Sequence, residues 1–331
     1  MDKAVLVSGG AGFIGSQVCK ALSKRGYTPV VIDSLVSGYE SFVQWGPLVR
    51  ADICNKDAVL ETIAQYNPIA ALHFAAFINV GESVQNPAKY YANNVGASIA
   101  YFQTLVEAGV SKIVFSSTAA VYGEPLTPSI DETHPTNPVN PYGQNKLIIE
   151  NMLADFATAY GTKHLCFRYF NACGSDPEGQ IGESHVPETH LIPLMLDAAS
   201  GRRPPLTIFG NNYPTPDGTC IRDYVHVVDL AEAHVLGLDY LLSGSESITL
   251  NLGNGQGFSV LNVLKAAEKE LGQPIPHTFG PRRDGDPAIL VANATKAKAI
   301  LGWTPQFPGL EDMIRHARQW RNSGLSTTIP L

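Results

Sequence analysis

The chain has 331 residues, of which 44% are hydrophobic and 16% charged, and its formal net charge is −7. This length is sufficient for two packed units. The sequence has no basic stripe and no run of like charges, so we expect neither nucleic acid nor an anionic membrane as a partner. An anionic ligand would have to be met by local arginines.

The five cysteines are scattered and odd in number, and no two form a Cys-x-x-Cys pair. This pattern argues against a disulfide framework and against a zinc site, so no metal is predicted and a reducing cytoplasm is expected. The N-terminus lacks a basic segment leading into a cleavable apolar one, and no stretch of about 18 apolar residues follows. Neither export nor membrane spanning is expected.

A glycine-rich segment follows the first apolar run, which covers residues 4–7. It reads Gly9-Gly-Ala-Gly-Phe-Ile-Gly15 and leads into a helix expected over 13–24. Such glycines allow a tight turn and a close approach to a pyrophosphate, which sits on the helix N-terminus. The positions predicted to hold it are Gly9, Gly12, Phe13, Ile14 and Gly15.

A second predicted strand, over 29–32, ends in Asp33 and Ser34, about 20 residues beyond the glycines. A carboxylate at this place accepts hydrogen bonds from both ribose hydroxyls and repels a 2′-phosphate. The sequence therefore predicts NAD rather than NADP.

Strands alternate with helices through the first half of the chain. Strands are predicted at 48–49, 69–76 and 113–115, and helices at 57–66, 87–108 and 142–160. This alternation indicates an α/β fold with a doubly wound parallel sheet, whose ligand lies at the carboxyl ends of the strands. Asp52, Ile53, Phe74 and Ala75 fall at those ends. His73 lies inside an apolar run, which favours a hydrogen-bonded core histidine over a catalytic one.

The predicted helix over 87–108 carries an apolar stripe at helical spacing: Tyr91, Val95, Ile99, Phe102 and Val106. We expect this stripe to pack on the sheet. Apolar residues that remain on the outer helix faces could pair with a second subunit, and we expect a homodimer, although the stripe alone does not decide this.

The regular alternation ends after Asn171, and Gly, Pro, Asn and Asp become frequent. We therefore predict an NAD-binding domain over 1–172 and a smaller, loop-rich substrate domain over 173–331. A strand near 250–253 is expected to return to the first domain. The tail from residue 323 is expected to be mobile.

Three side chains in the middle of the chain suggest proton transfer. Tyr142 and Lys146 are four residues apart, and if Pro141 opens a helix, both leave the same face. The lysine ammonium is expected to lower the pKa of the phenol from about 10, and Thr118 would supply a hydroxyl to the same oxygen. A Tyr-x-x-x-Lys pair alone is weak evidence, but here it accompanies a dinucleotide motif.

Two arginines of the second half, Arg222 and Arg283, stand in turn-rich segments. Most arginines are solvated surface charges. In an acidic chain with a nucleotide fold, these two are also reasonable bidentate clamps for a second diphosphate.

With these segments in view, the chain resembles the UDP-glucose 4-epimerases of the extended short-chain dehydrogenase/reductase superfamily. The resemblance extends to about Trp320. It rests on the glycine segment and on His73-Phe-Ala, Val80-Gly-Glu-Ser-Val84, Asn93-Asn-Val, Phe115-Ser-Ser-Thr-Ala-Ala-Val-Tyr-Gly123, Pro141-Tyr-Gly-x-x-Lys146, Arg168-Tyr-Phe-Asn171, Asp217-Gly-Thr-Cys-Ile-Arg-Asp-Tyr-Val-His226 and Arg283-Asp-Gly-Asp286.

The resemblance implies that Tyr142 is the base, that Lys146 lowers its pKa and holds the nicotinamide ribose, and that Thr118 binds the sugar 4-hydroxyl. It implies that NAD is held by the glycine segment and by Asp33, Asp52, Ile53, Phe74, Ala75, Asn93, Ser116 and Phe170. It implies that the UDP-sugar is held by Asn171, Leu191, Phe209, Arg222, Arg283 and Asp286.

Three positions depart from the family pattern. Ile78 stands where many members carry a lysine, and His190 replaces an asparagine that usually touches the diphosphate or uridine. Leu290 occupies a pocket-wall position that is tyrosine in some members and small in others. Its bulk is expected to disfavour 2-N-acetyl sugars, and a UDP-pentose 4-epimerase remains an alternative.

Two other functions compete. Similar nucleotide-sugar dehydratases and decarboxylases carry acidic residues directly after the catalytic threonine, where this chain has Ala119 and Ala120. A non-catalytic NAD-sensing protein would not need Tyr142, Lys146 and Thr118 together. Epimerisation is therefore the favoured prediction.

Overall fold

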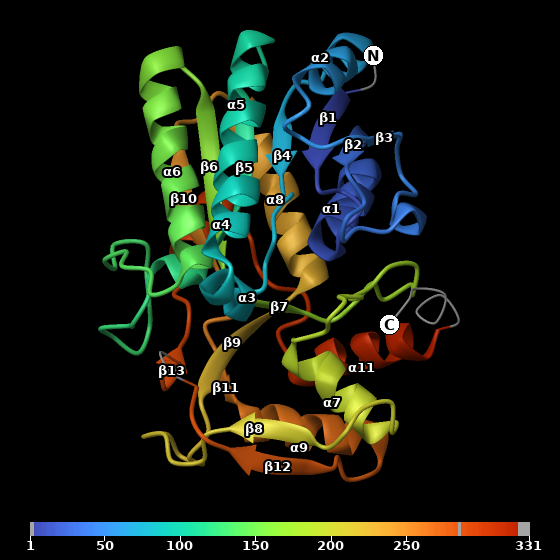
Figure 1. Ribbon diagram of the computed structural model, residues 1–331, viewed down its shortest axis with the longest axis vertical. Helices are drawn as coiled ribbons and strands as arrows, with labels where there is room; N and C mark the ends of the chain where they lie inside the picture. Colours follow the sequence, from blue (N-terminus) through green and yellow to red (C-terminus); the bar gives the residue numbers. More distant parts are fainter. Residues whose placement is uncertain (1–2, 284–285, 324–331) are drawn as a thin grey trace.

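The computed structural model describes residues 3–283 and 286–323 (Figure 1). Its centre is a parallel sheet of seven strands, which confirms the predicted fold class. In spatial order the strands are β10 (Ile248–Leu252), β6 (Lys163–Tyr169), β5 (Lys112–Thr118), β4 (Ala71–His73), β1 (Lys3–Ser8), β2 (Tyr27–Asp33) and β3 (Leu48–Arg50).

The two faces of this sheet bury alternate residues of each strand, as the period of two in a strand requires. In β1, Val5 and Val7 belong to one core, while Ala4 and Leu6 belong to the other. The first core is covered by α1 (Phe13–Lys24), α8 (Val227–Leu242) and α10 (Thr295–Leu301), and the second by α2 (Lys56–Tyr66), α5 (Ala97–Glu107) and α6 (Pro141–Tyr160). The layered arrangement is visible in the upper part of Figure 1.

Helix α6 begins and ends as its sequence predicts. Pro141 is its first residue, the side chain of Asn140 accepts a hydrogen bond from Gly143 N at 2.8 Å, and Gly161 ends the helix in the left-handed conformation. The start of α6 is thereby fixed next to the end of β5.

The predicted helix over 87–108 consists of α4 (Pro87–Tyr90), a π-helical segment η2 (Tyr91–Gly96) and α5. The wider π-turn changes the rotational phase of α5 relative to an unbroken α-helix. Tyr91 and Ile99 are consequently 39% and 44% exposed, whereas Tyr101 and Leu105 are buried. The prediction that the whole stripe packs on the sheet is wrong for Tyr91 and Ile99.

The second half of the chain returns to the parallel sheet. Strand β10 pairs with β6, as predicted for residues 250–253, and α8 packs against α1. The loop-rich composition did not reveal α8. The division into two domains at residue 172 stays a prediction, and the tail predicted to be mobile from residue 323 falls, after that residue, outside the described part of the chain.

Below the sheet in Figure 1, the rest of the second half forms a separate core of buried apolar residues from α7, α9 and α11. Its elements are β7 (Asn171–Cys173), α7 (Leu191–Ala199), β8 (Leu206–Phe209), β9 (Ile221–His226), β11 (Gly257–Ser259), α9 (Val260–Leu271), β12 (His277–Gly280), β13 (Ile289–Leu290) and α11 (Leu310–Asn322). The shorter elements α3 (Val80–Gln85), η1 (Glu40–Phe42) and η3 (Ala119–Val121) lie in the first half. Among the described residues, no helix has both the length and the apolar character that crossing a bilayer needs.

A buried ion pair joins α6 to the sheet. Glu150 of α6 is 7% exposed, and its carboxylate accepts from Nε of Arg168 on β6 at 3.0 and 3.1 Å and from the hydroxyl of Ser117 on β5. Arg168 also donates to the hydroxyl of Tyr122 at 3.1 Å. This network fixes the rotation of α6 about its axis and therefore the direction in which its first turn points.

We predict that Glu150→Gln lowers the free energy of unfolding by about 3–5 kcal/mol, because it leaves the buried Arg168 charge without a partner. Chemical denaturation followed by circular dichroism measures this. Glu246→Gln is the matched control: its ion pair with Lys163 is exposed, so the change should stay below about 1 kcal/mol. Equal effects of the two substitutions would contradict the role given to Glu150.

Candidate active site

The glycine segment lies at the carboxyl end of β1, where the sheet order reverses between β1 and β4. A Cβ at Gly9 would lie 2.5 Å from Ala75 N, and one at Gly15 would lie 2.2 Å from Gly9 O, so neither position accepts a side chain. Helix α1 starts at Phe13 without a side-chain cap at Gly12 and without an acidic residue in its first turn. Its free N–H groups and dipole therefore fit a pyrophosphate.

Asp33, at the end of β2, turns its carboxylate toward this segment. Its Oδ2 accepts from Ala11 N at 3.0 Å and its Oδ1 from Leu35 N at 2.8 Å. Burial raises the pKa of Asp33 above its ordinary value, although both backbone hydrogen bonds oppose the shift. A buried acceptor beside a glycine loop is the arrangement that a dinucleotide ribose needs, so these residues fit NAD.

The other predicted NAD contacts also lie around the carboxyl edge of the sheet. Ser34 and Asp52 are exposed, and Ile53 is buried. Phe74 and Ala75 follow β4, and Asn93 lies in the π-helical segment η2, where its Nδ2 donates to Asn94 Oδ1 at 2.9 Å. Ser116 of β5 is hydrogen-bonded through its hydroxyl to the Tyr169 hydroxyl, and Phe170 follows β6 in a buried position. Their contacts with NAD stay predictions.

The structure brings the three predicted catalytic residues together. Thr118 is the last residue of β5 and Tyr142 is in the first turn of α6, and the Thr118 hydroxyl lies close enough to Tyr142 to favour its phenolate. Lys146, one turn further along α6, is 2% exposed, and its Nζ donates to the carbonyl of Ser116 at 2.8 Å.

The electrostatics of this trio differ from the prediction. Burial raises the pKa of Tyr142 to about 12, and the hydrogen bond with Thr118 only partly opposes it. Burial also lowers the pKa of Lys146 to about 7, although the negative charge of Glu150 acts to raise it. The predicted lowering of the Tyr142 pKa by Lys146 is thus wrong for the protein alone, because Nζ points to the Ser116 carbonyl and lies 6.0 Å from the centre of the Tyr142 ring.

His73 is a hydrogen-bonded core residue, as predicted. It is 1% exposed, with Nδ1 2.6 Å from Ser8 Oγ and Nε2 2.9 Å from Ser98 Oγ. Burial lowers its pKa to about 3. A neutral, fully bonded imidazole at this place supports β4 and takes no part in proton exchange.

A cavity of about 420 Å³ lies beyond the trio, between β7, α7, β8 and β9. Seven predicted substrate residues line it: Asn171, His190, Leu191, Phe209, Arg222, Arg283 and Asp286. Arg222 forms an ion pair with Asp286, and the Arg283 guanidinium lies 4.2 Å from the centre of the Phe209 ring. Arg203, which sequence analysis missed, also lines the cavity and follows Arg202 before a Pro-Pro turn. The cavity is thus lined by the two arginines that were predicted to bind a diphosphate, Arg222 and Arg283, and by the aromatic ring of Phe209.

Thr118, Tyr142 and Leu290 do not line this cavity. Leu290, on β13, is paired in register with Arg222 and packs in a small cluster with Ala119 and Phe170. It therefore connects the arginine that lines the cavity with the strand end that carries Thr118. Ile78 is 43% exposed in the loop after β4.

A dinucleotide loop and a Tyr–Thr–Lys trio at one edge of a parallel sheet define an enzyme that acts with a nicotinamide cofactor on a hydroxyl group. Comparison with known proteins makes the class definite. Residues 5–253 match the NAD dependent epimerase/dehydratase family. A UDP-glucose 4-epimerase of Rhizobium leguminosarum bv. trifolii is 48% identical over 318 residues, covering 96% of this chain and 97% of its own.

Two solved structures agree. The UDP-glucose 4-epimerase of Brucella ovis in complex with NAD has a TM-score of 0.94 and 46% identity, covering 96% of this chain and 97% of that one. The enzyme of Bifidobacterium longum in complex with NAD+ and UDP has a TM-score of 0.92 and 35% identity, covering 98% and 99%. The chain belongs to the NAD dependent epimerase/dehydratase family, among its UDP-glucose 4-epimerases.

The lowered pKa of Lys146 predicts a pH dependence of stability. Between its folded value of about 7 and its ordinary value of 10.5, the folded chain binds fewer protons than the unfolded chain. The contribution of Lys146 to the free energy of unfolding must therefore rise with pH in this range, by up to about 1.4 kcal/mol per pH unit. Denaturation at several pH values should show this rise in the wild type relative to Lys146→Met. An unchanged or falling difference would contradict a pKa near 7.

Proposed function

We propose that the chain interconverts UDP-glucose and UDP-galactose, with NAD kept bound through the reaction. The observation that supports this best is that Tyr142 and Thr118 meet at the sheet edge that also carries the glycine loop and Asp33. The relatives are named for UDP-glucose, so the pentose alternative is not favoured.

NAD, held by the glycine segment, Asp33 and Lys146, would supply the hydride acceptor and donor for sugar C4, and its oxidised ring would bring a positive charge that favours the tyrosine phenolate. Tyr142 accepts the proton of the 4-hydroxyl and later gives it back, so no acid or base is consumed. Thr118 holds the same hydroxyl in position. Lys146 holds the nicotinamide ribose from a site where its Nζ is already directed by Ser116 O.

The UDP part would occupy the cavity. Arg222 and Arg283 are the cations available to a diphosphate there, and guanidinium groups bind phosphate oxygens in a bidentate manner. Arg222 is paired with Asp286 in the protein alone, so substrate phosphate would have to compete with or join this ion pair. Phe209, stacked under Arg283, offers an apolar face to the nucleotide.

Elimination and decarboxylation are disfavoured by the residues after Thr118. Ala119 is 4% exposed, and Ala120 follows it in the short helix η3. Neither side chain can carry the second proton that these reactions need. The non-catalytic alternative is disfavoured because Thr118, Tyr142 and Lys146 are all present at one edge of the sheet.

We further propose that the protein is a homodimer that works in the cytoplasm, with its two domains divided near residue 172. Tyr91, Ile99 and, at the end of α6, Tyr160 are large apolar side chains left exposed on neighbouring helices, which suits a subunit interface. All five cysteines are unpaired, as a reducing compartment allows. Analytical ultracentrifugation of the full chain measures the oligomeric state.

Tyr142→Phe should reduce kcat for UDP-galactose by about 10² to 10⁴, because it removes the general base while keeping the ring. Conversion to UDP-glucose is followed by chromatography. Bound NAD released on denaturation and the thermal unfolding temperature serve as controls, since both should stay near the wild-type values. Near-normal turnover by the variant would refute the assignment of Tyr142.

Leu290→Ser should raise kcat/KM for the 2-N-acetylated UDP-hexoses relative to the unsubstituted pair. Overpacking of the acetamide against leucine is expected to cost on the order of 1–3 kcal/mol, or roughly a tenfold to hundredfold preference in the wild type. The four hexose nucleotides are compared in both proteins. Equal efficiency of the wild type on both pairs would show that Leu290 does not determine selectivity.

A further inference from the structure

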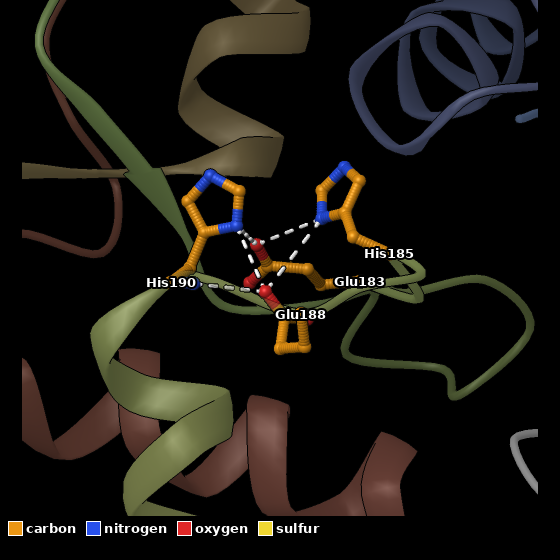
Figure 2. Close-up of side chains that lie close together, drawn as sticks. All are labelled: Glu183, His185, Glu188 and His190. Atoms are coloured by element: carbon orange, nitrogen blue, oxygen red, sulfur yellow. Dashed lines mark hydrogen bonds and ion pairs between the residues drawn. The ribbon is translucent and has the colours of Figure 1, made fainter. Parts of the chain in front are cut away.

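Four side chains from one short segment converge next to the cavity. The segment Glu183-Ser-His-Val-Pro-Glu-Thr-His190 precedes α7, and one ligand atom from each of Glu183, His185, Glu188 and His190 lies within 4.8 Å of the others. Figure 2 shows both imidazoles directing Nδ1 toward the two carboxylates. We call this group the His/Glu cluster.

The atoms of the cluster lie close together. His190 Nδ1 is 2.9 Å from Glu183 Oε1 and 2.9 Å from Glu188 Oε1, and His185 Nδ1 is 3.3 Å from Glu183 Oε1 and 3.9 Å from Glu188 Oε1. Four ligands around a tetrahedral zinc ion, with bonds of about 2.0–2.2 Å, are about 3.3–3.6 Å apart. The observed separations bracket this value.

Ion pairs within the cluster account for only part of the convergence, since both imidazoles contact the same oxygen, Glu183 Oε1. Glu183 and Glu188 are 2% and 6% exposed. Glu188 Oε2 is a buried atom with no hydrogen-bond partner among the described residues. A buried carboxylate oxygen without a partner is costly, and a cation at the centre of the cluster would satisfy it together with the four ligand atoms.

We propose that Glu183, His185, Glu188 and His190 bind one divalent transition-metal ion of the Zn²⁺ type. Two imidazole nitrogens and two carboxylate oxygens form a donor set that suits Zn²⁺, Co²⁺ or Ni²⁺ better than Ca²⁺ or Mg²⁺, which take oxygen ligands only. The inference does not depend on the proposed epimerase activity. It goes beyond the prediction of no metal, which considered only cysteine ligands and stays untested.

The position of the cluster indicates a structural ion rather than one that takes part in the chemistry. The His185 ring meets the Phe13 ring edge to face, 6.1 Å between centres, at the start of α1. Glu183 O accepts from Trp320 Nε1 of α11 at 3.2 Å, and His190 and Glu183 line the cavity. A bound ion would therefore hold together the glycine loop, the cavity wall and the C-terminal helix.

The pattern Glu-x-His-x-x-Glu-x-His within eight residues was the signal that sequence analysis overlooked. Side chains at such short spacing can meet where the chain turns back between them. The structure supplies that reversal in the segment between His185 and Glu188, where the two halves of the His/Glu cluster face each other (Figure 2).

Calorimetric titration of the chelator-treated full-length protein with ZnCl₂ tests the proposal. The wild type should bind one ion per chain, and Co²⁺ in its place should give the intense visible absorption of a tetrahedral site. His185→Gln should weaken Zn²⁺ binding by more than about 10-fold. Removal of an outer-shell partner of a metal site already weakens binding by about that factor, and removal of a direct ligand should weaken it more. The same ion should raise the thermal unfolding temperature of the wild type by mass action.

His277→Gln is the matched control, because His277 is an exposed histidine outside the cluster and its loss should leave Zn²⁺ affinity unchanged. Circular dichroism verifies that each variant is folded, and Glu183→Gln replaces His185→Gln if the latter is not. The proposal is overturned if the wild type shows no saturable binding or no tetrahedral Co²⁺ spectrum. It is equally overturned if both histidine variants bind Zn²⁺ as the wild type does, which would indicate surface histidines only.

Discussion

The ion pair between Glu150 and Arg168 is the constraint on which the catalytic geometry depends. It joins α6 to β6 inside the protein, and the Ser117 hydroxyl extends the connection to β5. Because α6 is held in one rotation, Tyr142 meets Thr118 and Lys146 meets the Ser116 carbonyl. The pair also acts on the charge of the site, since Glu150 opposes the burial that lowers the pKa of Lys146.

A buried polar group also connects distant segments within the second half of the chain. Asp223 of β9 is fully buried, and its carboxylate accepts from the backbone N–H groups of Asn254, Gly255 and Ala292 at 2.8, 3.0 and 3.1 Å. Burial raises its pKa to about 6 in spite of these three bonds. Such a group is tolerated because it fixes the loops after β10 and β13, and with them the strand that carries Arg222. Rigid polar connections of this kind let a loop-rich half present a defined cavity.

Much of the fold follows from local rules that act over a few residues. The bounds of α1 and the start of α6 are predictable because glycines that cannot bear a Cβ and a proline at the first helical position allow few alternatives. The rotational phase of α5 is not predictable in this way. It depends on the π-turn at residues 91–96, where Asn94 bonds to the backbone of Phe77, a residue remote in sequence.

The candidate site likewise has features that the sequence predicts and features that it does not. That Tyr142 and Lys146 leave one face of α6 was accessible from their spacing, but the charge states were not, because burial outweighs the Thr118 hydroxyl in setting the pKa of Tyr142. The His/Glu cluster and Arg203 escaped because their meaning depends on a chain reversal and on which residues border the cavity. Sequence patterns indicate which groups are present, whereas desolvation and convergence are properties of the packed chain.

The central claim is that this chain carries out a redox-neutral epimerisation with NAD it already holds. The most direct measurement incubates the purified protein with UDP-galactose and no added NAD, follows UDP-glucose, and then identifies the dinucleotide released on denaturation. The account predicts conversion to an equilibrium mixture and release of NAD(H). Absence of conversion by folded protein that retains NAD, or release of NADP(H) in its place, would contradict it.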